Sequence, residues 1–375
     1  MEERPPRMKK LCLLLLLLLL PALARGDALP VLRLDTPVLD YVAAKPGLLT
    51  LEDFSTPVTA KYRGSYSVTF TGKRNYSLHL KDEKGDQRKV SLLGLREDDD
   101  YVLLGALSDP CRLRDAVGLE LWRALDHAAP AAAPCELYFG DYYKGVYFLV
   151  ERPDRKSAGV PRDGALYRVL AARVDGVDLF SCPDPGAPGE ETWYNVGREY
   201  GGWEPLQGFL TADDPLSLLD LPAFADYCLY VNLIGATDNM KKNLYLGWDG
   251  DKLFPMPWDL DAAFGRLYNA SPADPDAWFS GPLPDGLMES EQFQALLRQQ
   301  WQKNRELLSP GSVMARFEAW HDRLGDAWDR EAARFPVYTD SSTGLSYPLD
   351  PEAELQFIRD YLEHRFALMD ALFGE

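Results

Sequence analysis

Several motifs that mark common enzyme classes are missing from this sequence of 375 residues. It has four histidines and no HExxH pair, which argues against a zinc hydrolase. No GxSxG elbow occurs, which argues against an α/β-hydrolase. The five cysteines form no CxxC pair, so a zinc–thiolate site is not expected. Neither type of glycine-rich phosphate loop, GxGxxG or GxxxxGK, is present, so any bound nucleotide must be held by other residues.

Long apolar runs are also scarce, and the one clear example lies at the start of the chain. Basic residues precede the run Leu11–Leu20, and the small-residue pattern Ala22-Leu23-Ala24 follows it. The run is too short for a membrane span, so residues 1–26 are predicted to be a secretory signal peptide. An uncleaved N-terminal anchor is the alternative. No membrane span is expected after cleavage, and the protein is expected to be secreted or held at the cell surface.

The chain has fewer basic than acidic residues. The net charge is −18 at neutral pH, and removal of residues 1–26 makes it more negative because this segment holds more basic than acidic residues. Such a surface repels nucleic acid and anionic lipid, so neither is an expected partner. Of the remaining cysteines, Cys111, Cys135, Cys182 and Cys228, an exported chain could form up to two disulfides. Buried thiols are the equally weighted alternative.

The hydrophobic pattern changes along the chain from β-like to helical. Alternating residues predict strands at 66–70, 76–80 and 101–104, and a hairpin over 136–150. Helical spacing of apolar residues is found in five segments: 112–126, 215–235, 289–307, 311–334 and 351–372. This order predicts an α+β fold. Its expected parts are a β-rich N-terminal lobe at about 31–152, a Pro/Gly-rich loop segment at 153–204, and a helical C-terminal lobe at about 205–375.

Acidic and amide side chains gather between the predicted helix 215–235 and the segment that follows it. Asp238 comes just after the helix, and Asn243 begins a predicted hairpin turned at Asp249-Gly250, a type I′ signal. The returning strand leads to Asp259 and Asp261, so the hairpin should bring these acids beside Asn243. An Asp, an Asn five positions later and a further acid is the order in which protein kinases place a catalytic base and Mg²⁺ ligands.

Simpler explanations exist for the same residues. An Asp-Asn pair in a loop is often a turn former, and Asp259 could cap a helix beginning near Leu260. The Asp-Leu-Asp sequence is also compatible with a Ca²⁺ site, which would suit adhesion rather than catalysis. Only the type of ion, a hard divalent cation, follows from these oxygen ligands.

A second candidate site is basic. Arg63 and Lys73 flank one predicted strand in a chain that is otherwise acidic. Arginine can hold a phosphate with its bidentate fork, and lysine can neutralise it as a point charge. Solvated charges at the ends of a strand are the alternative explanation.

Three blocks of the sequence together resemble the CotH kinase family, atypical secreted kinases named for a bacterial spore coat protein. The first runs from Tyr62-Arg63-Gly64 to Lys73-Arg74-Asn75-Tyr76-Ser77-Leu78, and the second is the hairpin Asp141-Tyr142-Tyr143-Lys144-Gly145-Val146-Tyr147. The third and most specific joins Thr237-Asp238-Asn239 and Lys242-Asn243-Leu244-Tyr245 to Pro257-Trp258-Asp259-Leu260-Asp261 and Phe264-Gly265. The three blocks follow one another in the same order as in the family, and the resemblance extends over residues 31–372.

This resemblance implies a divergent two-lobed protein-kinase-like fold over residues 27–375, with ATP and Mg²⁺ at the interface of the lobes. By the same resemblance, Asp238 matches the catalytic acid, and Asn243 and Asp259 match metal-binding positions. Asp261 is a further candidate ligand. Lys73 looks like the lysine that contacts the nucleotide, and Arg63 adds to it.

The sequence therefore favours a secreted kinase that transfers the γ-phosphoryl group of ATP to Ser or Thr of a secreted, coat or surface protein. Two departures bear on nucleotide binding. Residues 63–67 lack the family's longer basic and glycine-rich stretch, and Arg74-Asn75 stands where the family has Lys-Pro. A non-catalytic surface or coat assembly protein on the same fold is the alternative.

Overall fold

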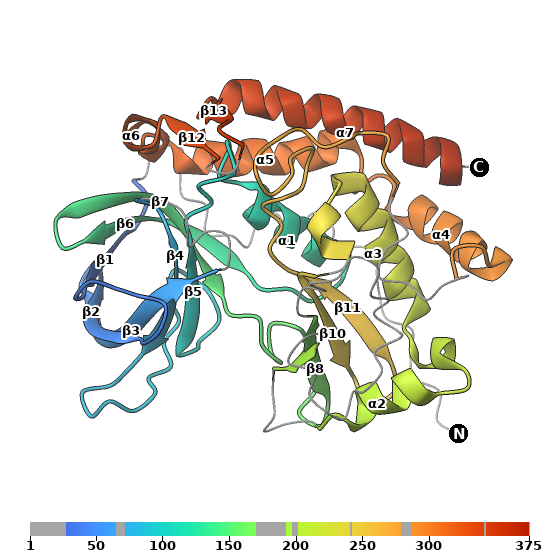
Figure 1. The fold of residues 1–375 in the computed structure, drawn as a ribbon, viewed down its shortest axis with the longest axis horizontal. Helices are drawn as coiled ribbons and strands as arrows, with labels where there is room; N and C mark the ends of the chain where they lie inside the picture. The colour runs from blue at the N-terminus through green and yellow to red at the C-terminus, as the bar shows by residue number, and fades with distance from the viewer. Residues whose placement is uncertain are drawn as a thin grey trace, which may run out of the picture.

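The structure is a computed structural model that describes residues 28–64, 72–169, 193–196, 202–240, 242–278, 287–340 and 343–374. Its architecture is mixed α/β. A β-barrel occupies one end of the molecule, and a small sheet and most of the helices occupy the other (Figure 1). The predicted signal peptide, the strand predicted at 66–70 and Cys182 lie outside the described residues.

The barrel is closed and uses the first strands of the chain in the order β1-β2-β3-β4-β5-β7-β6. Its strands are β1 (Val31–Asp35), β2 (Lys45–Leu51), β3 (Phe54–Arg63), β4 (Asn75–Leu80), β5 (Asp100–Leu104), β6 (Ala132–Phe139) and β7 (Tyr142–Glu151). All neighbours are antiparallel except β1 and β6, whose parallel pairing closes the barrel. The N-terminal region is thus β-rich as expected, but its closure into a barrel was not predicted.

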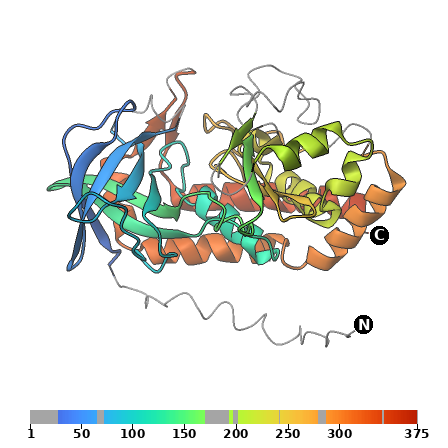
Figure 2. The same cartoon turned by 90° about the horizontal axis from the view of Figure 1, so that it is seen from below.

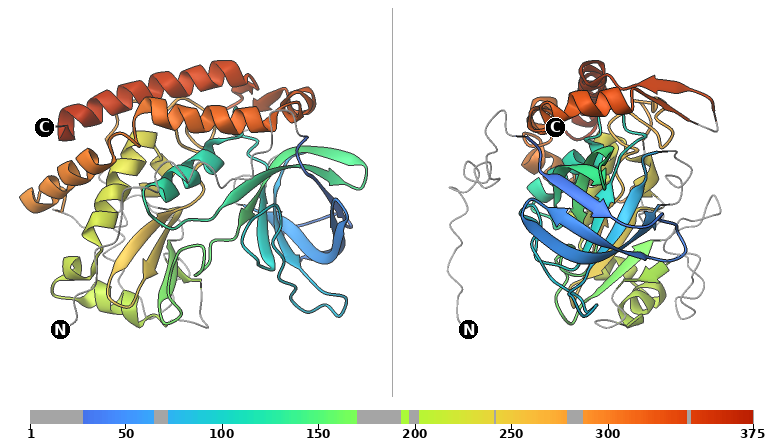
Figure 3. Two further views of the ribbon diagram at one scale, coloured as in Figure 1. Left: turned by 180° about the vertical axis from the view of Figure 1, so that it is seen from behind. Right: turned by 90° about the vertical axis from the view of Figure 1, so that its left-hand side faces the viewer.

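Alternation along each strand separates the inside of the barrel from the outside. On β3, Val58 and Ala60 point into the barrel core, and on β4 Leu78 and Leu80 do the same. The inner side chains form a hydrophobic cluster of their own, distinct from the larger core under the helices. Figure 3 shows the barrel with its strands facing the viewer.

A second sheet has the order β11-β10-β8-β9, formed by β8 (Ala165–Val169), β9 (Trp193–Asn195), β10 (Leu244–Trp248) and β11 (Leu253–Pro257). Two of these strands correct the prediction of a loop segment at 153–204. Residues 165–169 read Ala-Leu-Tyr-Arg-Val, and their apolar members are buried beside β10. This short strand was not predicted, because Pro and Gly residues surround it and its partner strand lies about 80 positions away along the chain.

The helices are α1 (Arg114–Ala124), α2 (Glu204–Thr211), α3 (Leu221–Ile234), α4 (Glu291–Asn304), α5 (Pro310–Leu324), α6 (Ala327–Arg334) and α7 (Pro351–Phe373), with short 3₁₀ turns η3 (Pro215–Leu218) and η4 (Thr237–Met240). The helix predicted at 215–235 is broken before Asp220, whose side chain caps α3 by accepting from the Ala223 N–H. The one predicted at 311–334 is two helices, because Gly325 has a positive φ of 48°.

The helices form a layer that reaches back to the barrel. Helices α5 and α7 pack together along the long axis, and α6, which follows α5, contacts β7 (Figures 1 and 2). Within the described residues, no helix is long and apolar enough to cross a membrane. Cys111, Cys135 and Cys228 are buried thiols. The division into two kinase-like lobes remains a prediction.

A buried glutamate on α6 joins the barrel to the helices. Glu331 is fully buried and forms an ion pair with Lys73, just before β4. Its Oε1 also accepts from Arg112 Nε at 2.9 Å, and its Oε2 accepts from the Val146 N–H of β7 at 2.8 Å. One carboxylate therefore links three segments that are far apart in sequence.

Burial lowers the pKa of Lys73 to about 7, and the positive charge of Arg112 lowers it further, against the opposing attraction of Glu331. The two neighbouring cations lower the pKa of Glu331, although its own burial acts the other way. The carboxylate is thus held in its charged form. Removing its charge would leave two buried cations without compensation.

We therefore expect Glu331→Gln to reduce the free energy of unfolding by about 3 to 5 kcal/mol, as measured by urea denaturation. Glu318→Gln on α5 is the matched control, because Glu318 forms an exposed ion pair with Arg359 at 2.7 Å. An exposed pair contributes at most about 1 kcal/mol. Equal losses in the two variants would contradict the linking role of Glu331.

Candidate functional site

Asp238 lies directly after α3 on the short turn η4. Helix α3 ends at Gly235, which has left-handed backbone angles of φ 63° and ψ 39° that glycine adopts without strain. The chain then turns toward the second sheet, as the sequence predicted. The carboxylate of Asp238 is mostly buried and forms an ion pair with Lys242 Nζ at 2.8 Å.

The side chain of Asn239 fastens this turn to the hairpin of β10 and β11. Its Nδ2 donates to the Asn243 carbonyl at 3.0 Å and to the Trp258 carbonyl at 2.9 Å. The Trp258 N–H in turn donates to the Asn243 carbonyl at 2.9 Å. Because Asn239 is fully buried, these bonds fix the catalytic candidate and both ends of the hairpin in one unit.

The hairpin brings Asn243 and Asp259 together, as predicted. Leu244 pairs with Pro257, so the residues flanking this pair emerge at the same end. Both Asn243 and Asp259 have a positive φ, of 58° and 62°, which Asn and Asp tolerate better than other residues. The turn at the far end differs from the predicted type I′ turn. It spans four residues, because the Asp249 carboxylate accepts from two backbone N–H groups, those of Asp251 and Lys252.

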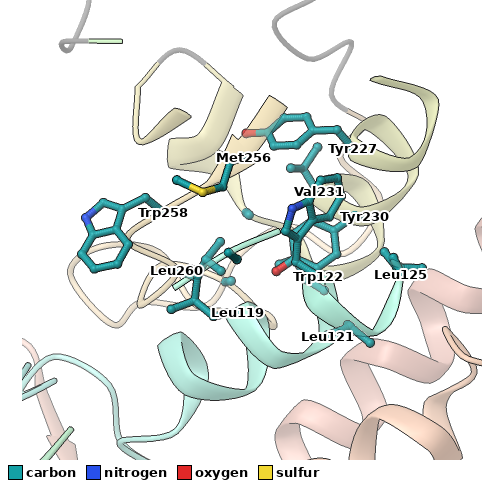
Figure 4. Close-up of a cluster of buried hydrophobic side chains, with 14 of the residues drawn as sticks. Leu119, Leu121, Trp122, Leu125, Tyr227, Tyr230, Val231, Met256, Trp258 and Leu260 are labelled. Atoms are coloured by element: carbon teal, nitrogen blue, oxygen red, sulfur yellow. The ribbon is translucent and has the colours of Figure 1, made fainter. Parts of the chain in front are cut away.

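Two hydrophobic anchors hold the loop after β11 in place. Trp258 and Leu260 are buried, and Leu260 lies beside Leu119 of α1 (Figure 4). The acids Asp259 and Asp261 alternate with these anchors along the chain. The Pro-Trp-Asp-Leu-Asp sequence thus supplies both the packing and the charge of the site.

A third carboxylate, which the sequence did not point to, joins these two. Asp115 of α1 is buried, and its Oδ1 accepts from the Leu260 N–H at 2.6 Å. Burial raises its pKa well above the usual range, and the negative charges of Asp261 and Asp259 raise it further. This role was not predicted, because Asp115 lies in a helix that is far from the hairpin along the chain.

Crowding of like charges dominates the electrostatics of the site. Burial raises the pKa of Asp261 to about 8, with further increases from Asp259 and Asp238, while the Ser108 hydroxyl donates to it at 3.3 Å. Burial also raises the pKa of Asp259, although Arg63 and Arg168 oppose this. Each acid is therefore harder to ionise than an isolated one.

Arginines approach the acids from the barrel and from β8. The Arg63 guanidinium lies 5.4 Å from the centre of the Trp258 ring, and its charge acts on Asp259. Arg168 of β8 lies over the Tyr245 ring at 5.9 Å, and its buried Nε has no hydrogen-bond partner in the part of the chain that the structure describes. Arg63 was predicted from the sequence. Arg168 was missed because β8 was taken for a loop.

Lys73 does not lie with the acids. Its ammonium group is buried against Glu331 and lies 5.2 Å from the centre of the Tyr147 ring. The structure thus brings Asp238, Asn243, Asp259 and Asp261 together with Arg63, and places Lys73 in the ion pair that joins the barrel to α6. Glu331 was missed because it is 258 positions away along the chain.

The oxygen donors of this site fit a hard divalent cation. Within the described part of the chain, no group of three or more His, Cys, Asp or Glu side chains has the geometry to hold a metal ion. The predicted set is instead two carboxylates and one amide. Mg²⁺ commonly uses one or two carboxylates and completes its shell with water and phosphate oxygens. A cation here would also offset the repulsion that raises the pKa of Asp261.

The model of a family described as CotH kinase protein matches residues 60–209 and 211–369. The chain belongs to the CotH kinase family. It is therefore a kinase-like protein, as the sequence blocks indicated. No curated protein matches it.

Two solved structures are similar over most of the chain. The proinflammatory kinase CtkA of Helicobacter pylori shares 11% identity at a TM-score of 0.38, covering 80% of this chain and 93% of that one. HipA of Shewanella oneidensis MR-1, from a complex with HipB and operator DNA, shares 14% identity at a TM-score of 0.35. That match covers 84% of this chain and 67% of the other.

The raised pKa of Asp261 predicts how stability depends on pH without metal. The folded state keeps a proton that the unfolded state releases above about pH 4, so the free energy of unfolding should fall between about pH 4 and pH 8. Asp261→Asn removes this ionisation. We expect the variant to be more stable than the wild type by on the order of 2 kcal/mol at pH 8.5 and to differ little at pH 4.

Urea denaturation in EDTA buffer at both pH values measures this difference. Asp251→Asn, at the exposed turn of the same hairpin, is the control and should match the wild type at each pH. An Asp261→Asn variant that is no more stable than the wild type at pH 8.5 would contradict the proposed charge crowding.

Proposed function

We propose that this chain is an extracytoplasmic protein kinase that uses ATP and Mg²⁺ to phosphorylate Ser or Thr side chains of another protein. One observation carries the proposal. A base candidate, an amide oxygen and two acids, from three segments of the chain, meet at one end of the β10–β11 hairpin beside an arginine. Membership of the CotH kinase family supports the same reaction class.

Asp238 is the proposed general base. Its carboxylate takes the proton of the substrate hydroxyl as that oxygen bonds to the γ-phosphorus and the bond to ADP breaks. The Lys242 ammonium lies 2.8 Å from this carboxylate and holds it in place by an ion pair. Because Asn239 fixes the turn, the base stays at a constant distance from the metal ligands.

Asn243, Asp259 and Asp261 are the proposed metal ligands. Bound Mg²⁺ would neutralise charge on the phosphates of ATP. The charges of Arg63 and Arg168 act on Asp259, and their guanidinium groups are the proposed contacts for phosphate oxygens. The buried Nε of Arg168, which has no partner among the described residues, offers a hydrogen bond that a phosphate oxygen would accept.

Lys73 has a supporting role in this proposal. Protein kinases hold their nucleotide-contacting lysine in an ion pair with a glutamate on a helix, and the pair must be formed for activity. The ion pair of Lys73 with Glu331 has this composition. It supports assigning Lys73 to the nucleotide side of the site.

The proposed location follows from residues 1–26, which we infer to be an export signal. The substrate is then a secreted, coat or surface protein. The strongly negative net charge disfavours binding to nucleic acid, so no nucleic acid partner is proposed.

We expect Asp238→Asn and Asp259→Asn each to lower phosphoryl transfer by at least about 100-fold, because one removes the base and the other a metal ligand. Transfer of ³²P from Mg²⁺–ATP to the chain itself and to a casein substrate measures this. Asp251→Asn removes a carboxylate from the same hairpin, away from the site, and should keep wild-type activity.

If either site variant transferred phosphate at the wild-type rate, the role assigned to the substituted residue would be wrong. A chain that shows no transfer and no Mg²⁺-dependent rise in melting temperature with ATP would instead be a non-catalytic assembly protein. A rise with Ca²⁺ alone would favour the adhesion alternative.

A further inference from the structure

A pocket of about 220 Å³ opens at one end of the barrel. It is lined by Tyr62, Gly72, Arg74, Tyr76 and Lys144. Tyr62 and Tyr76 are paired across β3 and β4, and Lys144 lies near the start of β7. The lining residues therefore come from strand ends that meet at the same rim.

Strand alternation sets this pocket apart from the proposed nucleotide site. Tyr62 packs against the core inside the barrel, whereas the next residue, Arg63, stacks on Trp258 outside it. Tyr76 likewise belongs to the inner core. The wall of the barrel thus lies between the pocket and Arg63.

The pocket is basic within a strongly acidic chain. Lys144 is half-buried over the Phe139 ring at 5.4 Å, and among the described residues it forms no ion pair. The Arg74 guanidinium lies 4.6 Å from the centre of the Tyr62 ring. Burial lowers the pKa of Lys144, and the positive charges of Arg334 and Arg74 lower it further. Within the described ranges, no carboxylate offsets this repulsion at Lys144.

Arg334 completes the basic rim from the end of α6. It is exposed, and its guanidinium lies over the Tyr142 ring at 5.9 Å and the Phe335 ring at 4.9 Å. Phe335 in turn lies 3.7 Å from the position that a Cβ on Gly72 would occupy. A larger residue at Gly72, which has a φ of 94°, would be strained and would narrow the opening.

An apolar ledge adjoins the same rim. The Tyr41 ring lies 5.2 Å from the Tyr62 ring, in the loop between β1 and β2. In this loop Val38 and Val42 are 89% and 92% exposed. These two exposed valines lie beside a cationic pocket. They could therefore contact apolar residues on either side of a charged group in a bound peptide.

We propose that this pocket binds the phosphate group of a phosphorylated peptide, with the apolar ledge contacting the neighbouring peptide residues. A phosphomonoester carries up to two negative charges and several acceptor oxygens, which match three clustered cations. The pocket is smaller than the sites that enclose drug-sized ligands, so it fits a phosphorylated side chain better than a nucleotide. The inference does not require the chain to be an active kinase.

The test is fluorescence anisotropy with a fluorescein-labelled peptide, Gly-Val-phosphoserine-Val-Gly, and its unphosphorylated counterpart. The wild type should bind the phosphopeptide at least tenfold more tightly than the unphosphorylated peptide. Inorganic phosphate should compete at least tenfold more weakly than unlabelled phosphopeptide, because it cannot use the ledge. Equal binding of the two peptides, or equal competition by phosphate, would overturn the proposal.

Three variants locate the site. Lys144→Gln should weaken phosphopeptide binding at least fivefold, and Lys144→Arg should largely preserve it. Lys84→Gln, at an exposed turn of the barrel, removes the same charge away from the pocket and should have no effect. Asp259→Asn should also leave binding unchanged, which separates this pocket from the acidic site. If Lys144→Gln weakened binding no more than Lys84→Gln, the assigned pocket would be wrong.

Discussion

The site depends on holding carboxylates together against their mutual repulsion. Asp115, Asp259 and Asp261 come from two segments, and burial makes their repulsion stronger than it would be in water. Neutral hydrogen bonds supply the restraint. The Leu260 N–H bonds to Asp115, and Asn239 ties the turn at Asp238 to both ends of the hairpin. The chain thus keeps an arrangement that costs stability, which is typical of functional sites.

The rest of the architecture supports this arrangement from a distance. Helix α1 carries Asp115 and packs against Leu260, while α3 delivers Asp238 (Figure 4). Glu331 connects α6 to the barrel, so the last third of the chain helps to position the β3–β4 region. The barrel then uses both faces of its wall, with Arg63 toward the acids and Tyr62 toward the basic pocket.

Features set by neighbouring residues were predictable from the sequence. The hairpin after Asn243 and the helix over 112–126 follow from turn chemistry and hydrophobic spacing. The convergence of Asp238, Asn243 and Asp259 needed only a short hairpin. For the same reason, the family blocks were recognisable in the order of the chain.

Contacts between distant segments could not be predicted in this way. Asp115, Glu331 and Arg168 reach the central region only through packing of elements that are remote in sequence. A short strand such as β8 gains its stability from β10, so its own residues signal it weakly. Closure of the barrel likewise depends on the pairing of β1 with β6 across about 100 residues.

The most direct test of the central claim is calorimetric titration with Mn²⁺ and a non-hydrolysable ATP analogue at pH 7.5. The account predicts saturable binding of the analogue that requires the metal and is lost in Asp259→Asn. Analogue binding without metal, or metal-dependent binding that is the same in the wild type and in Asp259→Asn, would contradict the assignment of the acid cluster as the nucleotide–metal site.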